Sequence, residues 1–207
     1  SGAVQEEYVE VVGGYYFSMD EARTVVESLR ATGEYPNEDL IRARLEVEVE
    51  CERICGQAFV PRYARESIDG YGQSRLLLSA VNPTKIRAAA LDGAALGSEQ
   101  ISAMRLDPSG LVEWHDSYWP DGQLNVSIAY EHGMAQPPAD LKRAAMTRLR
   151  QRLNMARGGV DDRTTTFTVA DGGTFSLAVP GRGGFETGSP DVDAVYERYK
   201  VRSAGVA

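Results

Sequence analysis

The chain has 207 residues, of which 43% are hydrophobic and 25% charged, and its formal net charge is −8. This length and composition suit one compact domain or two small ones and exclude a mainly disordered chain. The longest apolar runs fall far short of the roughly 20 residues that cross a bilayer, and the acidic balance argues against an exposed nucleic-acid-binding surface.

Two helices are predicted over residues 18–59. Ser18 and Glu21 have the spacing of a capping box, so a helix is expected to begin there and to end near Gly33. Asn37 is the expected N-cap of a second helix, in which apolar residues recur at three- and four-residue steps from Leu40 to Ala58. Six residues in it, LEVEVE, alternate like a strand. Because the apolar stripe extends to both sides of them, we predict helix.

Both cysteines of the chain lie in the second helix. Cys51 and Cys55 are one helical turn apart, and no other cysteine is available to complete a structural zinc site with them. We therefore expect reduced thiols that act as small buried side chains, in a protein that stays in the cell that makes it. The acidic N-terminus also lacks the pattern of a secretory signal.

Residues 60–134 change character. Short runs rich in β-branched and aromatic residues are interrupted by turn signals such as DGYG, NP, DPSG and PDG, which predicts antiparallel strands in a sheet or small barrel. The predicted strands are 62–68, 75–80, 84–91, 101–106 and 123–130.

A third helix over 137–158 begins at a Pro-Pro-Ala-Asp start and is expected to pack on the helix pair. Residues 159–180 contain two strand-like runs joined by ADGG, which predicts a β-hairpin. Ser189 is the expected N-cap of a short final helix within 181–207. The fold class is therefore α+β: a bundle of about three helices with an inserted antiparallel β-sheet or small barrel, a C-terminal hairpin and an extended arm.

Charge is unevenly distributed along the chain. Residues 1–52 carry thirteen acids and four bases, whereas residues 141–163 carry seven bases and two acids. These are either two solvated helix faces or opposite sides of a subunit that attract each other in a ring. In the second interpretation, the basic helix 141–157 and the acidic helices 19–56 lie on or near opposing faces. The candidate charge contacts between subunits are Arg143, Arg150, Arg157, Glu46 and Glu50.

Patterns for catalysis are weak. The loop VPGRGGFETGSPD has the glycine spacing of a phosphate-binding loop, but it lacks the lysine and has Pro190 where a long helix should begin. His115 and His132 lie in no metal-binding or nucleophile motif, and nothing selects two carboxylates for glycoside hydrolysis. We predict no catalytic residue, no metal and no cofactor.

Aromatic residues gather in EWHDSYW. Trp114, Tyr118 and Trp119 form a possible aromatic contact loop that would stack a sugar or a base, or they pack under a turn or into the groove of a partner.

Four stretches in order give the chain a resemblance to a known family. They are the helix pair through RICGQAFVPRY, the segment IDGYGQSRLLLS followed by TKIRAAALDG, the strand and helix start VSIAYEHGMAQPPADLKRAAM, and GGTFSLAVPGRGGFETGSPDVDAVYERY. In this order they resemble the head-to-tail adaptor (connector) proteins of long-tailed bacteriophages. The first seventeen residues lie outside the resemblance and have no assigned role.

The resemblance implies a structural, non-enzymatic virion subunit, made in the host bacterial cytoplasm. It would form a ring, expected to be dodecameric, between the portal protein and the next neck or tail-completion protein, and would extend the DNA channel without sequence-specific binding. The C-terminal segment would dock on the portal or a neighbouring subunit, with Arg182, Phe185, Val192, Tyr196 and Tyr199 as candidate contacts. The alternatives are a stopper or tail-terminator ring protein, a carbohydrate- or ligand-binding β module, and a hydrolase.

Overall fold

The computed structural model describes residues 12–115, 117–158, 166–168, 174–176 and 186–201, with side chains omitted at 155–158, 166–168 and 174–176. The chain divides into two compact units. A β unit comprises residues 1–14 and 60–135, and a helical unit comprises residues 15–59 and 136–207. The chain therefore leaves the helical unit, builds the β region and returns, which confirms the predicted α+β class with an inserted sheet.

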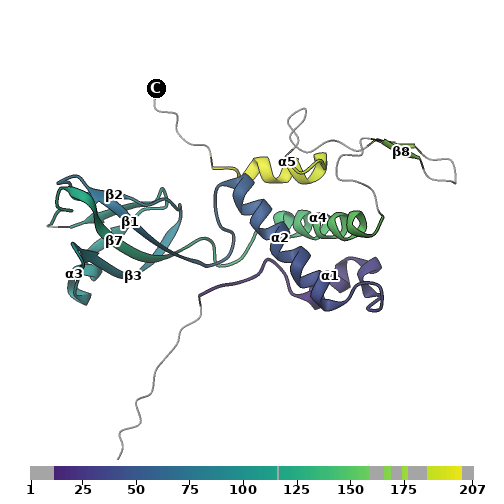
Figure 1. Ribbon diagram of the computed structural model, residues 1–207, viewed down its shortest axis with the longest axis horizontal. Helices are drawn as coiled ribbons and strands as arrows, with labels where there is room; N and C mark the ends of the chain where they lie inside the picture. The colour runs from purple at the N-terminus through teal and green to yellow at the C-terminus, as the bar shows by residue number, and fades with distance from the viewer. Residues whose placement is uncertain (1–11, 116, 159–165, 169–173, 177–185, 202–207) are drawn as a thin grey trace, which may run out of the picture. The chain divides into compact units, whose positions relative to one another are not determined.

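The helical unit is built on three longer helices (Figure 1). α2 (Asn37–Cys55) packs against both α4 (Ala139–Gly158) and α5 (Pro190–Tyr199), and α4 also packs against α5. α1 (Met19–Val25) and a 3-10 helix, η1 (Glu27–Arg30), precede α2. The LEVEVE run is helical, as predicted, because Val47 is fully buried on the same face of α2 as Leu40 and Cys51.

The start of the helical unit differs in detail from the prediction. The hydroxyl of Ser18 accepts from the Glu21 N–H at 3.0 Å, but α1 already ends at Val25 and Gly33 is not in the left-handed conformation. Val26 is the C-cap of α1, and its N–H donates to the Ala22 carbonyl. The guanidinium of Arg23 donates to the carbonyls of Leu29 and Tyr35 in the segment that follows.

The same guanidinium also displaces the predicted N-cap of α2. Arg23 donates to the side chain of Asn37 at 2.8 Å, so Asn37 is the first residue of α2 and Pro36 is its N-cap. A long-range arginine thus takes the cap that the local sequence pattern had assigned to the helix.

The β unit contains two antiparallel sheets. One has the order β1 (Arg62–Gly70), β7 (Gly122–His132), β3 (Pro83–Leu91), β4 (Ala94–Ala95), and the other has the order β2 (Arg75–Leu77), β6 (Leu111–Trp114), β5 (Met104–Leu106). Among the described strands, both sheets are open, so the predicted sheet is correct and its barrel alternative is wrong. The short helix α3 (Ser98–Ser102) precedes β5.

Two strand predictions need correction. Residues 101–106 are not one strand, because α3 occupies 98–102 and the Gln100 side chain accepts from the Gly97 N–H at 2.9 Å at its start. β6 was not predicted as a strand at all. It is short and follows the turn DPSG directly, yet it pairs with strands on both sides.

Apolar side chains from both sheets share one core. Its fully buried members include Trp119, Val112, Ile128 and Tyr130. At its edge, Asn125 accepts from the Gly70 N–H at 2.8 Å and donates to the Pro120 carbonyl at 2.9 Å. A Cβ on Gly70 would lie 1.8 Å from that carbonyl oxygen, so only glycine fits where the register between β1 and β7 shifts.

The predicted C-terminal hairpin is present as β8 (Thr166–Thr168) paired antiparallel with β9 (Thr174–Ser176). The glycine-rich arm that follows, with the candidate contacts Arg182 and Phe185, lies outside the described residues.

Candidate assembly surfaces of the helical unit

The terminal helix α5 is part of the core of its own unit. Val192 and Tyr196 are 1% and 0% exposed, and α5 contacts both α2 and α4. Burial of the phenol among apolar neighbours and the thiols of α2 raises the pKa of Tyr196. α5 therefore packs within its own chain. Val192 and Tyr196 are not available to a partner in this packing.

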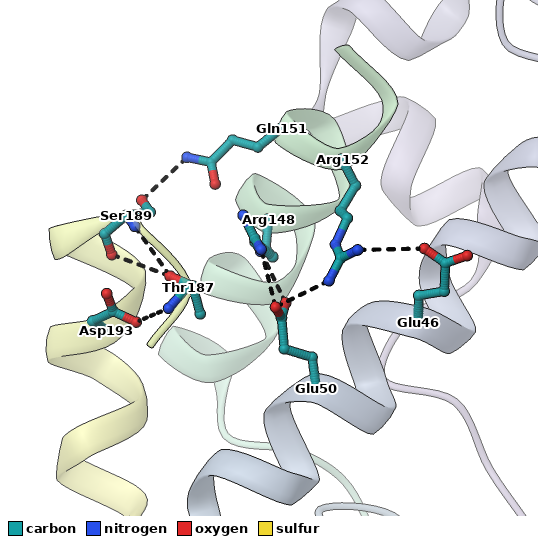
Figure 2. A network of polar contacts seen from close by, with 8 residues as sticks. All are labelled: Glu46, Glu50, Arg148, Gln151, Arg152, Thr187, Ser189 and Asp193. Atoms are coloured by element: carbon teal, nitrogen blue, oxygen red, sulfur yellow. Dashed lines mark hydrogen bonds and ion pairs between the residues drawn. The ribbon is translucent and has the colours of Figure 1, made fainter. Parts of the chain in front are cut away.

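A buried ion-pair network joins α4 to α2 (Figure 2). Arg148 forms two hydrogen bonds of 2.9 Å with the two carboxylate oxygens of Glu50. Arg152 donates to Glu50 at 3.0 Å and lies 3.7 Å from Glu46. The side chains of Arg148 and Glu50 are only 8% and 11% exposed, so this bidentate pair is largely removed from water.

The network has a clear electrostatic signature. Burial alone would raise the pKa of Glu50, but hydrogen bonds and positive charge from Arg148 and Arg152 outweigh it and hold this pKa below its usual value. Lys142 pairs with Glu21 at 3.0 Å as well. The acidic and basic helices therefore contact each other within one chain, and the prediction that they lie on opposing faces is wrong. Glu50 is paired with Arg148 and Arg152 of its own subunit.

A polar clasp fixes the segment that enters α5, shown at the left of Figure 2. The Asp193 carboxylate accepts from the Thr187 N–H at 2.9 Å, and the Thr187 hydroxyl accepts from the Ser189 N–H at 3.1 Å. Gln151 of α4 donates to the Ser189 hydroxyl at 3.1 Å. Ser189 is the N-cap residue, as predicted, but its side chain bonds to α4 instead of capping α5. The clasp thus fixes the residues that follow the glycine-rich segment in the sequence.

The C-terminal end of α5 is also held. The Tyr199 hydroxyl donates to Asp140 of α4 at 2.7 Å, and Arg198 pairs with the same carboxylate at 2.9 Å. The hydrogen bond from Tyr199 is the largest cause of a lowered pKa at Asp140. Beyond the helix, the Val201 N–H donates to the Cys55 carbonyl at 2.8 Å. Tyr199, a predicted docking residue, thus has a partner in its own chain.

Two of the exposed surfaces among the described residues of the helical unit combine apolar side chains with an elongated shape. On α2, Ile41, Leu45 and Val49 follow one another at one-turn intervals; we call them the α2 stripe. Between α4 and α5 runs a groove of about 400 Å³; we call it the α4–α5 groove. It is lined by Ala139, Asp140, Arg143, Ala144, Thr147, Asp191, Val192 and Val195.

The remaining charge candidates differ in position. Arg143 lies on the rim of the α4–α5 groove and is exposed, as is Arg150. Glu46 is half exposed beside Arg152. These three stay predicted contacts between subunits, and the side chain of Arg157 lies outside the described residues.

The predicted aromatic contact loop is largely core. Trp114 and Trp119 are 5% and 0% exposed, and their ring centroids lie 4.9 Å apart within the β unit. Only Tyr118 is exposed. The prediction that these three residues form one contact surface is wrong for both tryptophans, because β6 turns Trp114 inward.

Side chains that could bind a metal ion are dispersed in the part of the chain that the structure describes. No three histidine, cysteine or carboxylate side chains among these residues converge on a possible metal position. Cys51 and Cys55 are free and buried, with sulfur atoms 4.0 Å apart. The hydrogen bond with Cys55, together with burial, raises the pKa of the Cys51 thiol. None of the described helices is long and apolar enough to cross a membrane.

Sequence reasoning missed the clasp and the α2 stripe. The stripe had a signal, since residues 41, 45 and 49 repeat at four-residue steps beside the buried stripe of the same helix. The clasp had none, because Gln151 and Ser189 are 38 residues apart.

Comparison with known proteins identifies solved structures that have a similar fold. No protein-family model matches the chain, and no curated protein sequence does either. Among solved structures, it matches a chain in the neck of an empty GTA particle computed with C6 symmetry, with a TM-score of 0.60 and 18% identity over 96% of this chain and 97% of that chain.

Two further structures match. One chain, from the virion of a native gene transfer agent (GTA) particle, has a TM-score of 0.54 and 16% identity over 82% of this chain and 81% of that one. The other, from the neck of a native GTA particle computed with C12 symmetry, has a TM-score of 0.51 and 16% identity over 95% and 98%. The chain therefore shares its fold with chains of GTA necks and of a GTA virion, in agreement with the predicted resemblance.

Proposed function

We propose that this protein is a structural subunit of a ring at the head-to-tail junction of a phage-like particle, placed between the portal and the tail. The observation that carries the proposal is the match to a neck chain over nearly the full length of both chains. A match over both units, in their inserted order, is more specific than a match to one common sheet or bundle.

The number of copies in the ring is proposed to be twelve. One similar chain belongs to a neck treated with C12 symmetry and another to a neck treated with C6 symmetry. A twelve-fold ring satisfies both descriptions, because a C12 arrangement contains the C6 rotations. Head-to-tail contact between identical subunits closes into such a ring when the rotation divides a circle.

The proposed role is structural, and the charge of the chain suits it. The chain has 30 acids against 22 lysines and arginines. An acidic lumen lets DNA slide because it offers few cations to bind phosphates. DNA would therefore pass through the ring without sequence-specific contacts, while the portal and the next neck or tail-completion protein are the stable partners.

A carbohydrate-binding role for the β unit is less well supported. Sugar stacking needs exposed aromatic faces, and both tryptophans of the chain are buried in the core of that unit. A stopper or tail-terminator ring at the same junction remains the second candidate, because the similar structures are neck components.

Imaging of the purified protein mixed with its cognate portal by electron microscopy tests the proposal. We expect a ring of added density on the tail-proximal face of the portal. Addition of purified tails separates the two candidates, since a stopper or terminator would join tails without prior portal binding. A protein that joins neither would contradict the proposed function.

Point substitutions test the role of the arm better than a truncation does. Deletion of residues 181–207 would remove Val192 and Tyr196 from the core, so the remainder is expected to unfold. We propose instead that Arg182 and Phe185 contact the portal. The double substitution Arg182→Ala and Phe185→Ala should leave the helical circular-dichroism signal unchanged and reduce portal occupancy. Unchanged occupancy would contradict this role of the arm.

A further inference from the structure

The α2 stripe has the character of a docking surface. Ile41, Leu45 and Val49 are 42%, 45% and 64% exposed, and they form one line along the helix. Single exposed apolar side chains are ordinary, but a contiguous row costs solubility unless a partner covers it. A hollow of about 460 Å³ adjoins Leu45 and Val49 and is edged by Glu46, Arg53 and Arg152.

The α4–α5 groove has complementary properties. Its floor consists of small or short apolar groups, including Ala139, Ala144 and Val195, which leave room for larger side chains. Its length also fits. The stripe runs over nine residues of α2, from Ile41 to Val49, and the α4 wall over nine residues, from Ala139 to Thr147. Eight steps at 1.5 Å per residue make each about 12 Å long.

The stripe and the groove face different directions on the helical unit. Arg152 points from α4 toward Glu46 and Glu50 of α2, whereas Arg143 lines the groove. Nine residues separate these two arginines, which at about 100° per residue places them on opposite sides of α4. One subunit therefore cannot fill its own groove with its own stripe, but a neighbour can.

We propose that the α2 stripe of one copy docks in the α4–α5 groove of the next copy. This inference rests on the proposed ring function and supplies its subunit interface. A ridge of side chains four residues apart is the shape that fits between two helices. The charges at the edges of the two surfaces can pair with opposite sign. Exposed Arg42 and Glu46 flank the stripe, and exposed Asp191 and Arg143 flank the groove.

A second copy is the occupant that these features favour. Both complementary surfaces belong to the same chain and lie on different sides of one unit, which is the requirement for a head-to-tail ring. A different partner would require only one of them. The surviving charge candidates, Arg143 and Glu46, fall on the two rims.

The test uses one variant for each surface in the full-length chain. Leu45→Asp with Val49→Asp places two charges on the stripe, and Thr147→Trp fills the groove. These positions are exposed or partly exposed, so both variants should keep the wild-type circular-dichroism spectrum. Leu77→Asp, at a site 63% exposed on β2, is the matched control.

Sedimentation velocity measures the outcome. Each variant alone should lose self-association, and an equimolar mixture should give a 1:1 heterodimer and nothing larger, because only one intact stripe meets one intact groove. The control should associate as the wild type does. A stripe variant that assembles like the wild type, or a mixture without heterodimer up to the highest soluble concentration, would overturn the interface.

Portal binding separates this inference from the proposed function. If the wild type binds the portal and the stripe variant still reaches the same number of copies per portal, the interface is wrong and the function stands. If the wild type ignores the portal but the variants form the heterodimer, the function is wrong and the interface stands. A groove variant that self-associates normally but fails on the portal would assign the groove to the portal and overturn the second-copy occupant.

Discussion

The two units of this protein solve the problem of a stable core in different ways. The helical unit buries charged groups among its described residues, namely Arg44, Glu48 and Arg148 together with the largely buried Glu50. The core of the β unit is apolar and aromatic, with Asn125 as its buried polar side chain among the described residues. The stability of the helical unit thus depends on the pairing of its buried charges, and the stability of the β unit depends on the close packing of apolar side chains. This difference predicts which substitutions each unit tolerates.

The largest effect is expected from Arg148→Ala. It would leave Glu50 largely buried with only Arg152 as its cation, and breaking a buried ion pair costs about 3–5 kcal/mol. Helical circular dichroism followed through urea unfolding measures the loss. The double variant Arg148→Met with Glu50→Gln should recover much of it, since no uncompensated charge remains. Equal destabilisation by both variants would show that the network contributes packing alone.

Gly70→Ala tests how far the stability of the β unit depends on close packing. The added Cβ would collide with the Pro120 carbonyl oxygen, and strain of this kind costs about 1–3 kcal/mol. Both tryptophans lie in this unit, so tryptophan fluorescence reports its unfolding separately from the helices. Gly97→Ala, where the nearest atom is 3.7 Å from the new Cβ, is the control.

Used together, these two variants sharpen the comparison between the units. Arg148→Ala should shift the helical transition and Gly70→Ala the fluorescence transition, because each unit has its own core. If either variant shifts both probes equally, the units unfold as one cooperative structure.

A smaller effect is expected from acid. The pKa of Glu50 is lowered in the folded protein, so its stabilising contribution is fully present above its unfolded pKa and is lost as the pH falls through the lower folded pKa. Stability of the helical unit should therefore fall below about pH 4, the ordinary range of glutamate. Glu50→Gln should show a weaker dependence over that window. An identical slope in wild type and variant would place the acid sensitivity elsewhere.

The sequence predicted what depends on local pattern and missed what depends on distant partners. The LEVEVE run was correctly predicted as helix because its neighbours extend the apolar stripe. The N-cap of α2 was predicted wrongly, since Arg23 reaches the Asn37 side chain from fourteen residues away. The sequence showed which helices are acidic and which is basic. It could not show whether Glu50 pairs with Arg148 of its own chain or of a neighbouring subunit.

The smallest effect is expected at the clasp. Asp193→Ala removes the acceptor of the Thr187 N–H, and losses of this capping type cost roughly 0.5–2 kcal/mol. The substitution should lower the urea midpoint of the helical transition slightly and leave tryptophan fluorescence unchanged. Asp193→Asn keeps an acceptor and serves as the control. Because the clasp holds the residues that follow Arg182 and Phe185 in the sequence, Asp193→Ala should also weaken portal binding more than its stability loss implies. Equal portal occupancy in both variants would limit the clasp to a stabilising role.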